Sequence, residues 1–293
     1  MPTDVFTPKQ IAEALGVSES SVKRWVDNGR LPGARTVGGH RKVPMASLAD
    51  FVRETGQAVV RPDVVGMAPV SRRRRLESLQ DTLFDALISG DEAACRNLVL
   101  GAYQHGDSVS DLGDRLIGPV FSQIGEGWAA GEVAVRQERR SCEVMMATLH
   151  ELRRWLAPAT DRAPRAVVAT PHSDFAEVPA RLVELVLLSA GWRVEVAGSG
   201  LPLEEIRAAV QSAGPRLFCL SVTHVEDPDR FLQELGSRLM RPLGQAAAAD
   251  GGRIHRAIGG SALMRLASEP VECELFATSL NQLAARERDF RDA

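Results

Sequence analysis

The sequence predicts a multidomain protein that combines α-helical parts with an α/β part. At 293 residues, the chain is long enough for two or three domains. Apolar residues recur at helical spacing between Leu76 and Leu156, a stretch almost free of proline, and short apolar runs alternate with helical segments from residue 161 onward. We expect a head at residues 1–56, a linker at 57–75, a four-helix bundle at 76–160 and an α/β domain at 161–293.

Composition narrows the function classes. Hydrophobic residues make up 44% of the chain and charged residues 25%, and the net charge of −3 excludes a uniformly basic nucleic-acid coat. No apolar stretch approaches the ~20 residues that span a bilayer, and no basic leader precedes an apolar run, so we expect a cytoplasmic protein without membrane contact. The cysteines are scattered, which predicts buried free thiols and neither a metal pair nor a disulfide framework. They are Cys95, Cys142, Cys219 and Cys273.

The head begins with two short helices. Thr7 can cap a first helix, whose apolar residues share one face and which Gly16 ends. Ser18 can cap a second helix over Glu19–Asp27, with Val22 facing inward. This is a helix-turn-helix pattern, in which the second helix enters the major groove of DNA. The outward side chains expected to reach DNA are Ser20, Ser21, Lys23 and Arg24.

A basic wing follows the second helix. Residues 35–43 (RTVGGHRKV) predict a strand, a glycine turn and a second strand, that is, a hairpin beside the groove-reading helix. Such a hairpin favours contact with the phosphate backbone or the minor groove. Its candidate DNA-binding residues are Arg35, His40, Arg41 and Lys42. The alternative is that Arg41 and Lys42 are solvated charges.

Charge supports a basic head. Eight lysines and arginines against six acidic residues give residues 1–56 a charge of +2, which leaves −5 for the rest. The stretches FTPKQIAEALGVSESSVKRW and RTVGGHRKVP resemble the DNA-binding domains of the MerR family, and this resemblance implies double-stranded operator DNA as the partner. The related excisionase subclass also binds DNA. The run Arg72–Arg75 either touches phosphates or starts a solvated helix.

The middle and the C-terminal part have distinct patterns. Helix breaks are expected near Gly90, Gly106 and Gly131, and a simple dimerisation bundle is the alternative interpretation of this region. Beyond it, single helices separate the apolar runs, which predicts a parallel, flavodoxin-like (Rossmann-type) sheet that binds ligands at the carboxyl ends of its strands. The strands are expected at residues 165–170, 192–197, 217–222, 254–258 and, more weakly, 275–278.

This order of parts resembles the cobalamin-dependent light-sensing repressors of carotenoid genes, the CarH/LitR group. The resemblance implies that Trp128 and Glu138 lie over the upper face of a corrinoid. It also implies histidines on the bundle and in the loop after the first strand of the sheet. Those positions hold Ala129, Arg139 and Ala176, the last between Asp174 and Pro179. Alanine has no lone pair for a metal, so cobalt ligation by a histidine at position 176 is excluded.

At other positions that the resemblance implies, this sequence has the expected residues. Ser221, Gly259 and Gly260 match positions that hold the nucleotide tail or allow close backbone approach, and Thr223 lies at the same strand end as Ser221. Close approach and a tight turn are both open interpretations of the two glycines. His172 and His224 lie at strand ends and could in principle approach a ligand there. We expect no metal site and no cofactor held by histidine, while cobalamin or another tetrapyrrole remains the alternative.

Together these observations predict a transcription regulator that is not an enzyme. The expected protein is a dimer or tetramer that binds an operator and represses, with a small molecule or a protein as its effector. The alternative is a corrinoid-dependent or other tetrapyrrole-dependent photoreceptor regulator that binds its ligand without the lower histidine. A corrinoid-carrying enzyme subunit for methyl transfer or mutase chemistry fits poorly, because it would need the missing ligand and no winged helix.

Overall fold

A computed structural model describes residues 5–69, 74–265 and 272–291. The chain forms two units, one from residues 1–108 and 115–157 and the other from residues 109–114 and 158–293. Along the part of the chain that the structure describes, no helix is long and apolar enough to cross a membrane.

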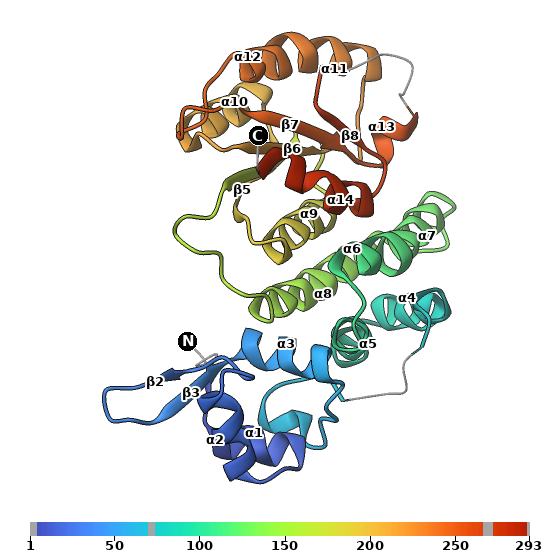
Figure 1. The fold of residues 1–293 in the computed structure, drawn as a ribbon. Helices are drawn as coiled ribbons and strands as arrows, with labels where there is room; N and C mark the ends of the chain where they lie inside the picture. Colours follow the sequence, from blue (N-terminus) through green and yellow to red (C-terminus); the bar gives the residue numbers. More distant parts are fainter. Residues whose placement is uncertain (1–4, 70–73, 266–271, 292–293) are drawn as a thin grey trace. The chain divides into compact units, whose positions relative to one another are not determined.

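The head of the first unit contains the two predicted helices and the predicted hairpin, together with a short strand β1 and a third helix α3 (Figure 1). At the start of α1, the Thr7 hydroxyl accepts from the Gln10 amide, and the Gln10 side chain accepts from the Thr7 amide in return. At the start of α2, the Ser18 hydroxyl accepts from the Ser21 amide. A small antiparallel sheet of order β1-β3-β2 completes the head, as the wing pattern predicts. The elements are β1 (Val5–Phe6), α1 (Pro8–Leu15), α2 (Glu19–Asp27), β2 (Ala34–Arg35), β3 (Arg41–Pro44) and α3 (Met45–Thr55).

The head has its own apolar core. Ile11, Val22 and Leu48 are fully buried, and the Trp25 ring lies 5.0 Å from that of Phe51. Burying a large apolar side chain contributes roughly 1.5–3 kcal/mol, so the three helices and the sheet stabilise one another through these contacts. The core therefore fixes the orientation of α2, and with it the polar face that α2 leaves exposed.

The segment predicted as a linker is packed where it is described. The amides of Val60 and Arg61 donate to the carbonyl of Ala14, at 2.8 and 3.0 Å, and a short 3-10 turn follows at Pro62–Val64. Four of its apolar side chains are buried, Val59, Val65, Met67 and Ala68, whereas Val60 is exposed. Arg74 and Arg75 are exposed, whereas Arg72 and Arg73 of the predicted basic run lie outside the described residues.

Four helical stretches form the middle of the chain, and the helices end where the sequence predicts. Gly90, Gly106 and Gly131 follow the ends of helices with φ angles of 72°, 101° and 78°, a left-handed conformation that favours glycine. After a 3-10 turn at Leu76–Leu79, the stretches are α4 (Gln80–Ser89), α5 (Glu92–Gln104), a run of α6 (Val109–Leu112), a π segment (Gly113–Ile117) and α7 (Gly118–Ala129), and α8 (Val135–Arg154).

The second unit is built on a parallel sheet of five strands in the order β5-β4-β6-β7-β8. β5, the second strand of the unit in sequence, thus lies at the edge of the sheet next to β4, the first. β6, β7 and β8 follow on the other side of β4, which is the flavodoxin-like order that the sequence predicts. All five expected strands are present. They are β4 (Arg165–Pro171), β5 (Arg193–Leu201), β6 (Leu217–Ser221), β7 (His255–Gly259) and β8 (Leu275–Ala277).

Helices cover both faces of this sheet. In Figure 1, α9 and α14 lie on one face and α10, α11 and α12 on the other. The second group buries its apolar side chains against the sheet, with Phe218 and Ile258 at the centre of the core. The helices are α9 (Glu177–Ser189), α10 (Leu203–Ala213), α11 (Pro228–Glu234) with a π segment (Leu235–Met240), α12 (Arg241–Gly244), α13 (Ser261–Arg265) and α14 (Leu280–Arg291).

A segment that is distant in sequence caps α14. The Asp114 carboxylate accepts from the amides of Leu280 and Asn281, at 2.8 and 2.9 Å, and the Ser110 hydroxyl donates to the Asn281 side chain at 2.9 Å. The first amides of a helix lack partners within the helix, so this carboxylate satisfies two of them. Residues 109–114 are therefore part of the α/β unit, although 43 residues separate them from Pro158.

Candidate functional site

Helix α2 presents a polar, basic face. Ser20, Lys23 and Arg24 are exposed and Ser21 is half-buried, as the helical pattern predicts, while Val22 points into the core. Lys23 pairs with Glu19 one turn earlier at 2.8 Å, with both side chains almost half exposed. An exposed pair of this kind is worth little, so Lys23 can exchange Glu19 for a phosphate.

The wing is tied to the end of α2. Asp27, the last residue of α2, accepts from Arg35 Nη2 at 2.8 Å and from Arg41 Nε and Nη2 at 2.9 and 2.7 Å. The Arg41 hydrogen bond is the main cause that holds the pKa of Asp27 below its ordinary value. Two of the four predicted wing contacts, Arg35 and Arg41, are thus held by a carboxylate, and their role on DNA stays a prediction.

An open cleft joins α1, α2 and the wing. It has a volume of about 230 Å³ and is lined by the wing residues Gly39, His40 and Arg41 together with Glu19 and Lys23 of α2. Lys9, at the start of α1, lines the same cleft and adds a cation that the sequence analysis did not single out. The cleft therefore has basic side chains from three elements, arranged around one acidic residue.

Four of the predicted ligand-pocket residues meet at the carboxyl ends of β6 and β7. Ser221 is paired with Gly259 in the sheet, and the Val222 amide donates to the Gly259 carbonyl at 2.8 Å. Gly260 has a φ of 127°, and a Cβ atom there would lie 2.1 Å from the Val222 carbonyl oxygen. Close backbone approach between the two strand ends thus requires a glycine at position 260.

Asp174 fastens the loop after β4 to the loop after β6. Its carboxylate is fully buried and accepts from the amide and the hydroxyl of Thr223, the latter at 2.7 Å, and from the Ala176 amide at 3.2 Å. The Thr170 hydroxyl donates to the Asp174 carbonyl at 2.9 Å. Thr223 is therefore engaged through both of its donors in holding the edge of the sheet.

Trp128 and Glu138 belong to the first unit. Trp128, near the end of α7, is 53% exposed, so it is not the core aromatic that one interpretation of the sequence allows. Glu138, in the first turn of α8, lies 3.6 Å from Arg139 Nε and accepts from the Cys142 thiol at 3.6 Å. Burial, and secondarily the Glu138 charge, raises the pKa of Cys142 to about 12, so this thiol is not a reactive thiolate.

The loop after β4 holds no histidine at the position that the resemblance gives for a cobalt ligand. Ala176 occupies the loop position of the expected ligand, and Asp174 beside it is committed to Thr223. His172 and His224 are both exposed in their loops. Across the ranges that the structure describes, no group of three or more histidine, cysteine or acidic side chains could hold a metal ion.

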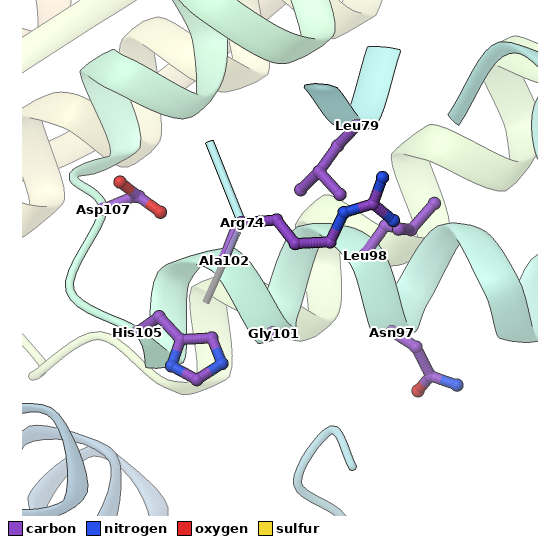
Figure 2. A pocket seen from close by; sticks show the side chains of 8 residues that line it. All are labelled: Arg74, Leu79, Asn97, Leu98, Gly101, Ala102, His105 and Asp107. Carbon is purple, nitrogen blue, oxygen red and sulfur yellow. The ribbon is translucent and has the colours of Figure 1, made fainter. Parts of the chain in front are cut away.

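A second, small pocket lies on α5 in the first unit. Figure 2 shows Arg74 beside Leu79 and Leu98, with His105 near the end of α5. Its volume is about 20 Å³, which accommodates about one water molecule. The pocket is too small for an organic ligand and contains none of the predicted site residues.

Two family models match separate parts of the chain. Residues 5–56 match the family model of a helix-turn-helix domain, and residues 79–153 match that of a B12 binding domain. No curated protein matches the sequence.

Solved structures also match this chain. The monomethylamine corrinoid protein of Methanosarcina barkeri is 18% identical with a TM-score of 0.57, over 73% of this chain and 99% of that chain. A novel cobalamin-binding protein from Desulfitobacterium hafniense is 18% identical with a TM-score of 0.33, over 72% and 98%. The methanol:cobalamin methyltransferase complex of Methanosarcina barkeri is 17% identical with a TM-score of 0.37, over 82% and 92%.

The first of these likenesses shows a shared fold alone. With the two family matches, it describes a chain that joins a helix-turn-helix domain and a B12 binding domain to a Rossmann-like parallel sheet of five strands.

Proposed function

We propose that the protein is a sequence-specific DNA-binding transcription regulator of the MerR type, acting as a repressor in the form of a dimer or tetramer. The observation that supports this most is the exposed polar face of α2 beside a hairpin wing, with Lys9, Lys23 and His40 lining one cleft. The proposed DNA contacts are Ser20, Ser21, Lys23, Arg24, His40 and Lys42. Arg35 and Arg41, which the sequence also predicts as contacts, bond to Asp27 at the base of the wing.

The experiment measures binding of the full chain to a fluorescein-labelled DNA duplex of arbitrary sequence at several salt concentrations. Each lysine or arginine that contacts a phosphate contributes about 0.9 to the slope of log affinity against log salt. We expect Lys23→Ala to weaken binding and to reduce that slope by about 0.9 per bound protomer. Selection from a random duplex pool then gives a specific site. If the full chain binds neither duplex at low salt, the proposal is wrong.

We further propose that the B12-binding-like body senses an effector and assembles the regulator without a cobalt–histidine bond. Ala176 supports this, because its methyl group has no donor atom and the adjacent carboxylate of Asp174 is fully engaged by Thr223 and backbone amides. The effector is then a small molecule or a protein. Purified protein incubated with adenosylcobalamin should lose the corrinoid on gel filtration.

The match of residues 79–153 to a B12 binding domain favours a second candidate. In this candidate, a corrinoid or another tetrapyrrole is held without the lower histidine, and Gly260 allows close backbone approach at the edge of the sheet. The same gel filtration distinguishes the two candidates. A visible corrinoid spectrum that elutes with the protein contradicts the cofactor-free regulator and supports this one.

A further inference from the structure

The two arginines at the base of the wing face each other across the hairpin. Arg35, the last residue of β2, and Arg41, the first of β3, are direct partners in the antiparallel register. Like charges directly opposite each other in a β-ladder repel and destabilise the pair. The closed hairpin therefore needs a negative charge between these two guanidinium groups.

Asp27 supplies that charge from an unfavourable place. It is the last residue of α2, where the helix dipole disfavours a carboxylate. Both of its oxygens are engaged, Oδ1 by Arg35 and by Arg41 Nε, and Oδ2 by Arg41 Nη2. The Arg41 side chain is only 20% exposed in this arrangement, against 61% for Arg35. A residue that breaks a local rule and is compensated twice is typical of a position that serves function.

The bonds from Arg35 and Arg41 to Asp27 determine where the wing tip lies. Beyond Arg35 and Arg41, the chain turns through Thr36–His40, closed by bonds from the Thr36 amide to the His40 carbonyl (2.9 Å) and from the Gly39 amide to the Thr36 carbonyl (2.8 Å). Gly39 and His40 then line the same cleft as Glu19 and Lys23 of α2. The distance between the wing tip and the groove-reading face of α2 thus depends on these hydrogen bonds to Asp27.

We infer that Asp27 is a positioning residue for DNA recognition, which holds the wing against α2 through Arg35 and Arg41 both in the free protein and on DNA. This inference rests on the proposed DNA-binding function. It means that Arg41, which makes two bonds to Asp27 and is only 20% exposed, is not a phosphate contact, and that the salt dependence comes from other basic side chains, among them Lys23 and Lys42. Sequence discrimination then depends on Asp27, although Asp27 itself does not touch a base.

The test measures the salt slope of the full chain on a duplex of arbitrary sequence. Arg41→Ala should leave the slope unchanged, whereas its strand neighbour Lys42→Ala, the matched control, should reduce it by about 0.9 per bound protomer. Asp27→Asn should steepen the slope by about 0.9 for each arginine that it frees. In the double variant Asp27→Asn, Arg41→Ala, the slope should increase less than in Asp27→Asn, because the freed Arg41 is no longer there to contact a phosphate.

A second measurement compares affinity for a duplex selected by the wild-type chain with affinity for the arbitrary duplex. Asp27→Asn should lower this ratio, whereas Asp27→Glu, which keeps the negative charge, should leave it near the wild-type value. Circular dichroism verifies that each variant is folded, so that a lower ratio cannot come from loss of the fold. A fall of the slope by about 0.9 in Arg41→Ala, or no change of slope in Asp27→Asn, overturns the inference and leaves DNA binding standing. If the wild-type chain binds no duplex, the proposed function falls, and the inference with it.

Discussion

The guanidinium group of Arg53 lies 3.8 Å from the centre of the Tyr103 ring, and its Nη1 donates a hydrogen bond of 2.6 Å to the Tyr103 carbonyl. It also donates to the Asp107 carbonyl at 3.2 Å. Arg53 is in the last turn of α3, and Tyr103 is in the last turn of α5, where a cation is favoured by the helix dipole. The last helix of the head is thereby attached to the bundle within the first unit.

Tyr103 is the only tyrosine of the chain, so its titration can be followed by ultraviolet absorbance. Burial raises its pKa above the ordinary 10.0, and the charge of Arg53 partly offsets this rise. We expect Arg53→Gln to raise the pKa further, because the phenolate loses a neighbouring cation. Arg53→Lys, which keeps the charge, should change it little. A fall toward the ordinary value in Arg53→Gln would show instead that Arg53 is needed to keep the ring buried.

The same titration has a consequence for stability. The pKa of Tyr103 is higher in the folded chain than in the unfolded chain, so folding favours the protonated phenol. Its contribution to stability is complete below about pH 10 and is lost as the pH rises through the raised pKa. Denaturant midpoints measured across this range should fall, and they should fall less in a Tyr103→Phe variant.

A largely buried ion pair joins Arg256 of β7 to Glu274, the residue directly before β8. Glu274 accepts from the Arg256 amide at 2.8 Å and from its guanidinium at 2.7 and 3.1 Å. Burial alone would raise the pKa of Glu274, but these bonds and the positive charge of Arg256 outweigh it and lower the pKa to about 2. The contribution of Glu274 to stability is present above its ordinary value of 4.5 and is lost as the pH falls toward about 2.

Glu274→Gln should destabilise the protein by about 3 kcal/mol at neutral pH, because it leaves the Arg256 charge largely buried without its partner. In this variant, the free energy of unfolding measured with urea should also fall less steeply as the pH drops from 4.5 toward about 2. Glu272→Gln is the matched control, since Glu272 and Arg241 are both 62% exposed and 3.9 Å apart. Equal losses of stability in the two variants would contradict this account.

The Asp174–Thr223 contact predicts a further loss of stability. Asp174→Ala leaves the amide and hydroxyl of Thr223 without their acceptor, at a cost of about 1–3 kcal/mol in the free energy of unfolding. Thr223→Ser keeps the hydroxyl and should cost much less. Urea unfolding of the full chain measures both variants, and a mild effect of Asp174→Ala would show that water replaces the carboxylate.

Capping of α14 gives a separate test. Asp114→Ala removes the acceptor of the Leu280 and Asn281 amides and should cost about 1 kcal/mol. Asp289→Ala is the control, because this carboxylate pairs with the exposed Arg286 side chain in the last turns of the same helix. Hydrogen exchange should rise at the first turn of α14 in Asp114→Ala alone.

Local signals in the sequence account for most of the fold that could be predicted. Thr7 and Ser18 cap their helices through bonds to residues three positions away, and the glycine helix ends are equally local. The alternation of strands and helices was sufficient for the order of the sheet, because parallel crossovers allow few arrangements. Residues 57–69 read as a linker because Pro62 and Pro69 interrupt any period, although contacts with Ala14 order part of the segment.

The candidate sites were harder to predict for a physical reason. Arg41 and Lys42 look alike in sequence, yet Arg41 pairs with Asp27, 14 residues earlier, and hydropathy patterns contain no sign of such a pair. Asp174 and Thr223 are 49 residues apart and meet only because β4 and β6 are neighbours in the sheet. An acidic residue at the end of α2, where the helix dipole disfavours it, was the one available signal for Asp27.

The cap on α14 also constrains how the protein is made. Asp114 leaves the ribosome long before its partners Leu280 and Asn281 in α14, since 166 residues separate Asp114 from Leu280. Because domains fold in order during synthesis, the α/β unit stays incomplete until α14 has emerged, while the head can finish earlier. A fragment starting at Pro158 would lack the capping residue, so a nascent chain or a gene fusion that separates residues 109–114 from the sheet should yield a weakened α/β unit.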